Sequence, residues 1–463
     1  MQNDAVLTRQ LWLVGVGFFM QTLDSTIVNT ALPSMARSLG ESPLRMESVI
    51  VAYTLTMAMV IPASGWIADR FGLRRTFLAA IILFVMGSIA CASSSTLNML
   101  VCARVLQGMG GAMLLPVGRL SVLRTFPRQR LLEAMSFVAI PGLIGPLIGP
   151  TLGGWLTQVA SWHWIFLINV PVGVAGAIAT RHYMPEGRVS DMPRFDIAGY
   201  GLLTFGMVAI SMAIEGLGEF GMRQAMVLVL LIGGFAGIVA YWLHAIRQPN
   251  PLFSPALFSV PTFRVGLLGN LFARIGVGAM PFLIPLLLQV SLAYSPLEAG
   301  MMMLPVSAAN LGTKRFVMRL VMRHGYRRVL IVNTLSIGAT IACFAAFFAA
   351  APLAIKFVML AALGVQNSLQ YSTMNTIVLK DLGAAQASGG NSLLSMTQML
   401  AMSLGVTAAG ALLAGFSDLF GRATPAETLS SFRATLACIG ALTAASAWIF
   451  WQLEPDRPAP ATA

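Results

Sequence analysis

The chain of 463 residues contains little charge: 10% of its residues are Asp, Glu, Lys or Arg, whereas a soluble domain has about 25%. It therefore has too few polar side chains to cover a surface in water. This scarcity excludes a soluble enzyme and a nucleic-acid-binding protein. Hydrophobic residues make up 57% of the chain, enough for about a dozen membrane-spanning helices of about 20 residues each. The composition predicts an all-α integral membrane protein with many spans.

Cysteine and histidine are also scarce, with four of each. All four cysteines fall in apolar runs without the spacing of metal ligands or of a disulfide framework, so we interpret them as small buried hydrophobic residues. The histidines fall at the ends of apolar runs. The sequence predicts no metal site and no cofactor. The residues concerned are Cys91, Cys102, Cys343, Cys438, His163, His182, His244 and His324.

The signatures of membrane-bound enzymes and nucleotide-driven pumps are absent from the sequence. An intramembrane aspartyl protease needs two carboxylates at membrane depth, but only Asp24 lies near the middle of an apolar run. No HExxH motif occurs, and no phosphate-binding loop of the form GxxxxGK(S/T) occurs either. The sequence therefore predicts that the protein is not an enzyme. A channel is not excluded by composition.

Apolar runs of about 20 residues, bounded by charged residues, Pro or Gly, predict fourteen membrane-spanning helices. The connections between the runs are short, so no soluble domain fits between them. The predicted helices are 11–32, 48–68, 76–94, 97–119, 132–157, 163–182, 196–216, 225–244, 265–290, 297–318, 328–349, 352–376, 390–415 and 431–452.

The distribution of basic residues predicts the orientation in the membrane. If the amino terminus is cytoplasmic, 21 of the 29 Lys and Arg residues lie on the inner side, Arg119 among them. Six lie on the outer side, and Arg104 and Arg274 lie inside helices. Because cytoplasmic loops carry the excess of Lys and Arg, both termini are expected in the cytoplasm.

An internal repeat divides the chain. The loop Arg70–Arg75 and the loop Arg323–Arg328 both read R-x-G-x-R-R. Each follows the second helix of a six-helix half if residues 186–260 form two additional helices. We therefore expect an amino-terminal half over residues 1–185 and a carboxy-terminal half over 261–463. Two similar halves of parallel topology favour an alternating-access transporter over a channel.

Longer motifs give the chain a resemblance to a known family. It resembles the major facilitator superfamily, specifically the fourteen-helix branch of drug:proton antiporters, over nearly its whole length. Two positions depart from the usual pattern, with Leu73 where a basic residue is common and His163 where Arg is common. The matching stretches are Leu23–Pro33, Gly65–Arg75, Arg104–Ala112, Gly145–Gly154 and Trp162–Pro171.

By this resemblance, the loop after the second helix is a conformational latch that holds the two halves in one state and releases them in the other. Its expected partner is the start of the thirteenth helix, near Gly389 and Asn391. The second copy of the loop has Met322 at the position of Asp69, so its latch is expected to be incomplete. The alternative is a basic loop that only sets orientation. The latch residues are Gly65, Asp69, Arg70, Gly72, Arg74 and Arg75.

The fifth helix contains the motif that the resemblance associates with antiporters. Its glycines recur every four residues, so they share one face on which helices pack backbone to backbone. Its prolines remove N–H donors and bend the helix. Such a helix suits a sliding seal, and the alternative is a purely structural packing face. The motif residues are Gly145, Pro146, Gly149, Pro150, Gly153 and Gly154.

Three charged residues lie near the middle of predicted helices, where charge is costly and usually functional. From the 1.5 Å rise per residue, Asp24 lies roughly 20 Å and Arg104 roughly 22 Å above the inner helix ends, so the two can meet. We expect Asp24 to bind the transported proton, about one per cycle, and Arg104 to modulate its affinity. The alternative is a permanent buried ion pair that fixes helix packing.

The substrate cavity is expected to be lined by polar residues of several helices. With two arginines at depth and one carboxylate, neutral, zwitterionic or anionic compounds fit better than dications, and Arg274 is a candidate contact for a carboxylate. For any single polar residue, a hydrogen bond between helices is an equal explanation. The cavity residues are Gln21, Asn29, Gln107, Arg274, Gln289, Asn310, Asn367, Gln370 and Tyr371.

Together, these patterns predict a proton-coupled transporter of the bacterial inner membrane. It is expected to act as a monomer and to export small organic compounds by alternating access, in exchange for protons. The alternative substrates are organic anions or metabolites such as carboxylates. A channel or a membrane-embedded enzyme is the alternative of a different class.

Overall fold

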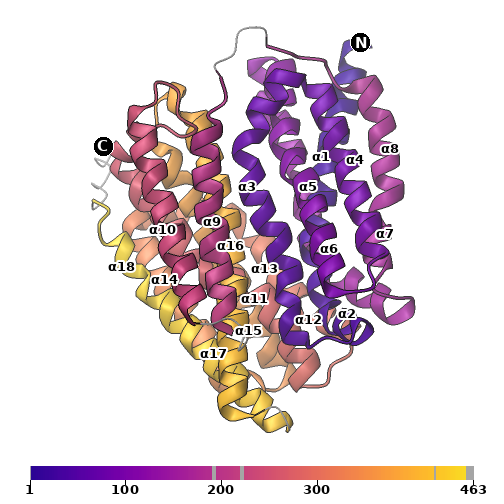
Figure 1. Ribbon diagram of the computed structural model, residues 1–463, viewed down its shortest axis with the longest axis vertical. Coiled ribbons are helices and arrows are strands. Elements are labelled where there is room, and N and C mark those ends of the chain that lie inside the picture. Colours follow the sequence, from indigo (N-terminus) through magenta and orange to yellow (C-terminus); the bar gives the residue numbers. More distant parts are fainter. Residues whose placement is uncertain (1, 190–193, 219–223, 422–423, 455–463) are drawn as a thin grey trace.

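The computed structural model describes residues 2–189, 194–218, 224–421 and 424–454. Over these residues the chain is helical and forms no strand. Thirteen of the described helical segments are long and apolar enough to cross a membrane. Figure 1 shows them side by side, most running along the long axis of the molecule. The predicted all-α membrane fold is confirmed.

Helices of the amino-terminal half are joined by tight turns. Glycine with positive φ ends two of them, at Gly40 (φ 70°) and Gly72 (φ 93°), where an L side chain would be strained. The Thr96 hydroxyl caps the start of α5 by accepting a hydrogen bond from the Met99 N–H. The elements are α1 (Gln2–Ile27), η1 (Val28–Thr30), α2 (Leu32–Leu39), η2 (Pro43–Met46), α3 (Glu47–Phe71), α4 (Leu73–Ala92), α5 (Leu97–Thr125), η3 (Arg128–Arg130), α6 (Leu131–Val159), α7 (Trp164–Leu167) and α8 (Asn169–Tyr183).

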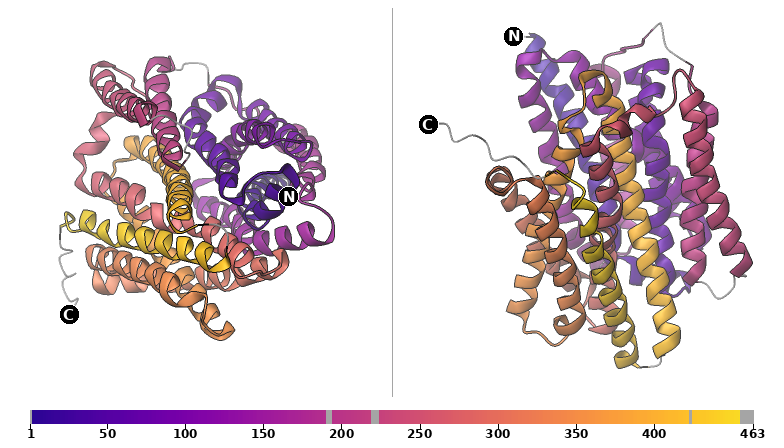
Figure 2. Two further views of the ribbon diagram at one scale, coloured as in Figure 1. Left: turned by 60° about the horizontal axis from the view of Figure 1, so that its bottom comes forward. Right: turned by 90° about the vertical axis from the view of Figure 1, so that its left-hand side faces the viewer.

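Two additional helices, α9 (Ile197–Gly218) and α10 (Gln224–Arg247), lie at the edge of the bundle in both views of Figure 2. They pack closely against each other, since a Cβ atom on Gly206 would lie 3.0 Å from the Gly234 carbonyl oxygen. On its other side, α9 contacts α3 and α16. This pair therefore borders both halves of the molecule.

A cluster around Asp196 ties this pair to the segment that follows it. One carboxylate oxygen of Asp196 is hydrogen-bonded to the His244 ring at 2.7 Å and to the Gly199 N–H at 2.9 Å. The other oxygen accepts from the Leu252 N–H at 3.2 Å. This Asp196 cluster joins the start of α9, the end of α10 and the chain leading to the carboxy-terminal half.

The carboxy-terminal half begins with a short 3-10 helix, η4. Capping boxes begin α12 and α17, in which Ser295 pairs with Glu298 and Thr424 with Glu427. The elements are η4 (Pro255–Ser259), α11 (Pro261–Leu286), η5 (Leu287–Ser291), α12 (Pro296–Met302), α13 (Leu304–His324), α14 (Tyr326–Cys343), η6 (Phe344–Phe348), α15 (Leu353–Lys380), α16 (Ala384–Phe420), α17 (Pro425–Ala445) and α18 (Ala447–Phe450).

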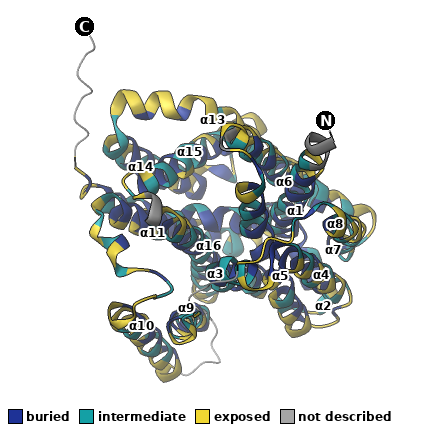
Figure 3. Cartoon of the chain, turned by 90° about the horizontal axis from the view of Figure 1, so that it is seen from above, coloured by how far each residue is buried: buried dark blue, intermediate teal, exposed yellow. Residues whose placement is uncertain are grey.

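Thirteen of the fourteen predicted ranges each overlap one apolar spanning segment. The exception is 297–318, where the structure has two helices, α12 and α13, that meet at Met303. Helix α13 continues to His324 and includes four Lys and Arg residues besides that histidine, so it is less apolar than the spanning segments. Figure 3 shows exposed residues along most of α13, at the rim of the bundle.

Two further expectations are corrected. The predicted boundary at 119 is wrong, because α5 continues to Thr125 and places Arg119 inside the helix rather than at its inner end. Burial was expected for all four cysteines, but only Cys91 is buried. The other three are exposed on the helix bundle, because a small apolar side chain is equally suited to a surface that lipid covers. They are Cys102, Cys343 and Cys438.

Candidate substrate cavity and buried charge pair

A cavity of about 700 Å³ lies between the two halves. Helices α1, α3 and α5 form one wall, and α15 and α16 form the other. The cavity extends from the middle of the bundle to the end where the two R-x-G-x-R-R loops lie, which we call the motif end; the opposite end is the far end. Residues along the cavity include Gln21, Ser25, Tyr53, Asp69, Arg119, Tyr371, Asn391 and Gln398.

Direct backbone packing between α6 and α12 closes the far end. A Cβ atom on Gly154 would lie 2.1 Å from the Pro296 carbonyl oxygen, and one on Gly300 would lie 2.3 Å from that of Pro150. Glycine is required at both positions, because any side chain would push the helices apart. The cavity thus reaches one end of the molecule, while helix packing between the halves blocks the other.

The glycines of the predicted antiporter motif lie on the face of α6 that packs against α1. A Cβ atom on any of three of them would lie within 2.4 Å of an atom of α1 or η1; these are Gly145, Gly149 and Gly153. Their four-residue spacing therefore serves contact within the amino-terminal half. Gly154, on another face, serves contact between the halves.

Proline in α6 creates a further link between the halves. Pro150 has no N–H to donate to the Pro146 carbonyl oxygen four residues earlier. This oxygen instead accepts a 2.8 Å hydrogen bond from the Ser307 hydroxyl of α13. The prolines of the motif thus expose a backbone acceptor that the other half uses.

The predicted latch loop is bound to its own half in this structure. Arg74 donates from Nε to the Met184 carbonyl oxygen at 2.7 Å and from Nη1 to the Glu186 carboxylate at 3.1 Å. Asp69 forms an ion pair with Arg124 near the end of α5. The loop therefore holds the connection that follows α8.

The expected partner of the latch lies across the cavity. Asp69 and Asn391 both line it, on α3 and α16 respectively. No atom of another element lies within 4 Å of a Cβ built on Gly65 or on Gly389. The two walls are therefore apart at these positions. The remaining latch residues are the exposed Arg70 and Arg75 and the turn residue Gly72.

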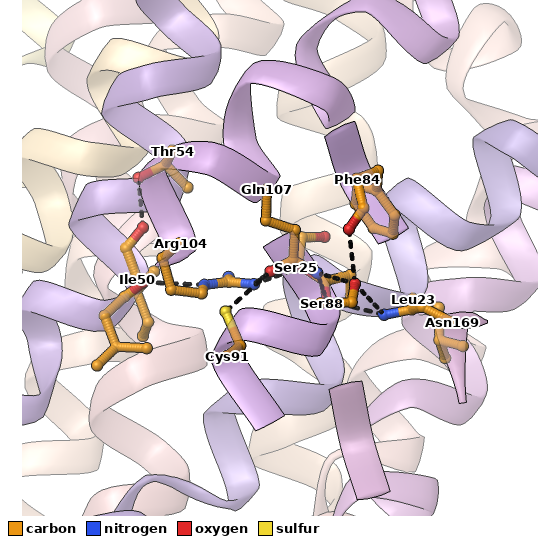
Figure 4. A network of polar contacts seen from close by, with 12 residues as sticks. Leu23, Ser25, Ile50, Thr54, Phe84, Ser88, Cys91, Arg104, Gln107 and Asn169 are labelled. Carbon is orange, nitrogen blue, oxygen red and sulfur yellow. Dashed lines mark hydrogen bonds and ion pairs between the residues drawn. The ribbon is translucent and has the colours of Figure 1, made fainter. Parts of the chain in front are cut away.

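A fully buried polar network surrounds Asp24, whose side chain is 0% exposed. Figure 4 shows Ser88, Arg104, Gln107 and Asn169 of this network. Its Oδ2 accepts a 2.6 Å hydrogen bond from Arg104 Nη1. Its Oδ1 accepts from Gln107 Nε2 at 2.7 Å and from Asn169 Nδ2 at 3.2 Å. Gln107 also accepts from Arg104 Nη1 at 2.7 Å and donates to the Ser88 hydroxyl at 2.9 Å. Helices α1, α4, α5 and α8 thus meet at one carboxylate.

Aromatic rings enclose the guanidinium of Arg104. Its central carbon lies 4.2 Å from the centroid of the Tyr53 ring and 5.7 Å from that of Phe166. Stacking on aromatic faces and the ion pair together offset the loss of hydration of a buried guanidinium. Asp24 and Arg104, which the sequence placed at similar depth, are therefore in contact and shielded from the cavity.

Two arginines lie beside the cavity without a carboxylate partner in the described part of the chain. The Arg274 guanidinium stacks on the Tyr371 ring at 4.6 Å, and its buried Nε has no hydrogen-bond partner in the described part of the chain. Arg119 of α5 lines the cavity and lies 5.9 Å from the centroid of the Phe18 ring. Each half thus contributes one cation to this region.

Of the nine predicted cavity residues, only Gln21 and Tyr371 line this cavity. Gln107 belongs to the buried network, and Arg274 lies behind Tyr371. The other five lie elsewhere on their helices; Gln289, for example, donates to the Thr30 carbonyl oxygen at 3.0 Å, which links the halves near the far end. The five are Asn29, Gln289, Asn310, Asn367 and Gln370.

Sequence reasoning missed two residues of this region, Arg119 and Tyr53. The signal for Arg119 was the apolar pattern that continues through Leu123 and extends the helix past the arginine. Tyr53 gave no signal, since an aromatic residue in an apolar run is typical of any membrane helix. In the described part of the chain, no group of three or more His, Cys, Asp or Glu residues is arranged to hold a metal ion.

Comparison with known proteins identifies the family. The sequence model described as Major Facilitator Superfamily matches residues 14–243. A protein of Pectobacterium carotovorum named multidrug resistance protein MdtD is 50% identical over 456 residues, which cover 98% of each chain. The chain belongs to the major facilitator superfamily. A protein of the same name from Serratia proteamaculans is 49% identical over 98% of this chain and 95% of that relative.

Solved transporter structures share the fold. A POT family transporter in complex with 5-aminolevulinic acid superposes with a TM-score of 0.70 over 96% of this chain and 95% of its own, at 15% identity. The human organic anion transporter MFSD10 gives a TM-score of 0.61 over 96% and 99%, at 13% identity. The resemblance inferred from the motifs is confirmed, and the protein is a membrane transporter rather than an enzyme.

Proposed function

We propose that this protein exports small organic compounds across the bacterial inner membrane in exchange for protons. The observation that carries the proposal is the Asp24–Arg104 ion pair, buried directly behind a cavity that reaches only one end of the bundle. The relatives named multidrug resistance protein support drug-like compounds as substrates. The transporter acts as a monomer and without a cofactor.

The motif end is the cytoplasmic end in this proposal. The predicted loops on this side hold most of the Lys and Arg residues, and positive charge is retained on the cytoplasmic side of membranes. Both termini then lie in the cytoplasm. The structure corresponds to the state in which a substrate enters the cavity from the cytoplasm.

Alternating access requires the two ends to exchange roles. At the far end, α6 and α12 separate where Gly154 and Gly300 now touch the opposite backbone. At the motif end, Asp69 leaves Arg124 and approaches the first turns of α16 near Gly389, where the positive end of the helix dipole attracts a carboxylate. The Asp69–Arg124 pair is partly exposed, so little energy is needed to exchange it for another partner.

Proton exchange occurs at Asp24 as the halves move. In the present state the ionised carboxylate is paired with Arg104 at 2.6 Å. When the pair separates, a carboxylate left in an apolar environment binds a proton, and it releases the proton when Arg104 returns. Arg104 stays charged throughout. The cycle carries one proton inward for each substrate that moves outward, in the simplest form that a single buried carboxylate allows.

Transport by purified protein in proteoliposomes with an imposed pH gradient tests this function. The Asp24→Asn variant is expected to lose uphill transport while still exchanging substrate down its own gradient. Asp196→Asn, which removes a buried carboxylate from the cluster beside α9, is the matched control and is expected to keep pH-driven transport. Unimpaired uphill transport by Asp24→Asn would exclude this residue from the coupling.

Organic anions such as carboxylates are the second candidate substrates, favoured by Arg119 and Arg274. These two cations border the cavity, and arginine binds a carboxylate with two parallel hydrogen bonds. Tyr371 lies between the cavity and Arg274, so a bound anion would displace or share this ring.

A comparison of matched anions and cations in the same vesicles distinguishes the two substrate classes. Arg274→Gln is expected to raise the KM for an anionic substrate about tenfold and to leave the KM for a cation unchanged. An equal change of KM for anionic and cationic substrates would show that Arg274 does not distinguish substrates by their charge.

A further inference from the structure

We propose that Tyr53 is a gate between the cavity and the buried Asp24–Arg104 pair, which must open before Asp24 can exchange a proton with water. The inference rests on the proposed function and adds a residue to it. The gate consists of one side chain with two positions. In the closed position, seen here, the ring lies between Arg104 and Gly111; in the open position it lies in the cavity.

Tyr53 is placed between the two compartments. Its ring lies 4.2 Å from the guanidinium carbon of Arg104, and the same residue lines the cavity. The other hydrogen-bonding and ring partners of the pair named above do not line it: Gln107, Asn169 and Phe166 are absent from its wall. Among these contacts of the pair, Tyr53 is the one that also lines the cavity, so the proposed route from the cavity to Asp24 leads past its ring.

The hydroxyl of Tyr53 has no hydrogen-bond partner in the described part of the chain, although the side chain is only 1% exposed. A buried hydroxyl without a partner is unfavourable. The stacking on Arg104 favours the closed position, whereas the hydroxyl favours the open position, where it meets the polar cavity. Because these two effects oppose each other, the closed position is only slightly more stable than the open one, and the ring can move between them.

Gly111 makes room for this hydroxyl. A Cβ atom at position 111 would lie 2.7 Å from Tyr53 Oη and 3.3 Å from the ring carbon that carries it. Gly111 belongs to the Arg104–Ala112 motif. An alanine at position 111 pushes the Tyr53 ring toward the cavity, so the closed position of the ring requires glycine there. The Gly111→Ala variant therefore opens the gate without removing the aromatic ring.

A native cysteine reports on the opening of the gate without any transport measurement. Cys91 is fully buried, and its sulfur lies 3.6 Å from Gln107 Oε1, inside the network. A small thiol reagent such as methyl methanethiosulfonate reaches it only when the gate opens. The modification rate of Cys91, measured by peptide mass spectrometry on the full-length protein in nanodiscs, is the readout. The exposed Cys102 on the same helix as Gln107 is the internal control.

One variant is expected to slow the modification of Cys91, and two are expected to accelerate it. Tyr53→Phe keeps the ring and removes the unfavourable hydroxyl, so Cys91 is expected to react about tenfold more slowly than in wild type, the ratio for about 1.4 kcal/mol. Tyr53→Ala and Gly111→Ala are expected to raise the rate at least tenfold. Cys102 should react at the same rate in all of them. A wild-type Cys91 rate in Tyr53→Ala and Gly111→Ala, or a faster rate in Tyr53→Phe, would overturn the proposal.

Proton coupling is then measured on the same variants in proteoliposomes. An open gate is expected to let protons leak without substrate in Tyr53→Ala, and a slow gate to shift the pH midpoint of transport in Tyr53→Phe. Tyr371→Phe, another cavity tyrosine that stacks on an arginine, is expected to change the KM for substrate without moving the pH midpoint. If the Cys91 rates follow Tyr53 but no variant or wild type shows proton coupling, the proposed function fails and the gate stands. If coupling is present but the Cys91 rates are constant, the gate fails alone.

Discussion

The two halves share a helical design but bury different polar groups. In the amino-terminal half, the Asp24 carboxylate and the Arg104 guanidinium meet, with Gln107 bonded to both. In the carboxy-terminal half, Asn333 donates to Gln370 at 2.7 Å, and Gln370 donates to Thr334 at 2.8 Å, all of them neutral. A carboxylate is thus present in one network and absent from the other.

Sequence composition reinforces this asymmetry. No acidic residue occurs between Glu298 and Asp381, a stretch that includes α13, α14 and the whole of α15. This part of the carboxy-terminal half therefore lacks any carboxylate for proton exchange, whereas Arg274 of α11 supplies a cation beside the cavity. Under the proposed function, this asymmetry assigns the proton to one half and part of the substrate contact to the other.

Substitution of the central glutamine in each network is expected to give the largest contrast. Gln107→Leu removes one hydrogen-bond partner from each of two buried charged groups, so we expect a loss of stability of about 3 kcal/mol and at least a tenfold loss of pH-driven transport. Gln370→Leu leaves only neutral groups unpaired, at about 1–2 kcal/mol. Thermal unfolding and proteoliposome transport measure both. Equal loss of pH-driven transport in the two variants would contradict the asymmetry.

Glycine substitutions compare the contact between the halves with the outer surface of one half. Gly154→Ala places a Cβ 2.1 Å from the Pro296 carbonyl oxygen, whereas a Cβ at Gly312 of α13 meets no atom of another described element within 4 Å. We expect Gly154→Ala to weaken the closed far end and to slow transport severalfold. Gly312→Ala is expected to stabilise its helix by about 0.5–1 kcal/mol. Opening of the far end in Gly154→Ala is measured with a cysteine introduced on the cavity wall by Ser392→Cys. The labelling rate of this cysteine should fall as the motif end closes.

The two loop motifs offer a third and smaller contrast. Asp69 pairs with Arg124, while its counterpart Met322 is 76% exposed. Asp69→Asn is expected to lower transport severalfold but to change stability by less than about 1 kcal/mol, because the ion pair is partly exposed. Met322→Asp should have little effect on either property. Loss of transport in Met322→Asp comparable to that in Asp69→Asn would mean that both loops latch.

The smallest expected effect is that of low pH on stability. It tests the Asp196 cluster, which joins α9, α10 and the chain leading to the carboxy-terminal half. Burial by itself raises the pKa of Asp196. Hydrogen bonds from the Gly199 N–H, the His244 ring and the Leu252 N–H lower the pKa by more than burial raises it, so it lies below its ordinary 3.8. The stabilisation is complete above this ordinary value and is lost as the pH falls through the lower folded value. Asp196→Asn should flatten the thermal stability profile below about pH 4. A profile identical to wild type would show that the cluster is energetically neutral.

The sequence alone determined which segments form spanning helices and how deep the charged residues lie along them. Thirteen of the predicted helices match spanning segments, because the length of an apolar run and the rise per residue suffice to place a helix in a bilayer. The same calculation put Asp24 and Arg104 at one level, and they are in contact. The range 297–318 differed because basic residues in α13 interrupt the apolar pattern.

Only the tertiary structure decided which side of each helix faces the cavity. Gln21 and Gln370 are equally polar and equally central in the sequence, yet one lines the cavity and the other bonds to Asn333 on α14. Tyr53 and Gly111 are far apart in the chain, and their contact depends on how α3 and α5 are rotated against each other. Helix rotation and tilt result from packing between distant segments, which no local pattern records.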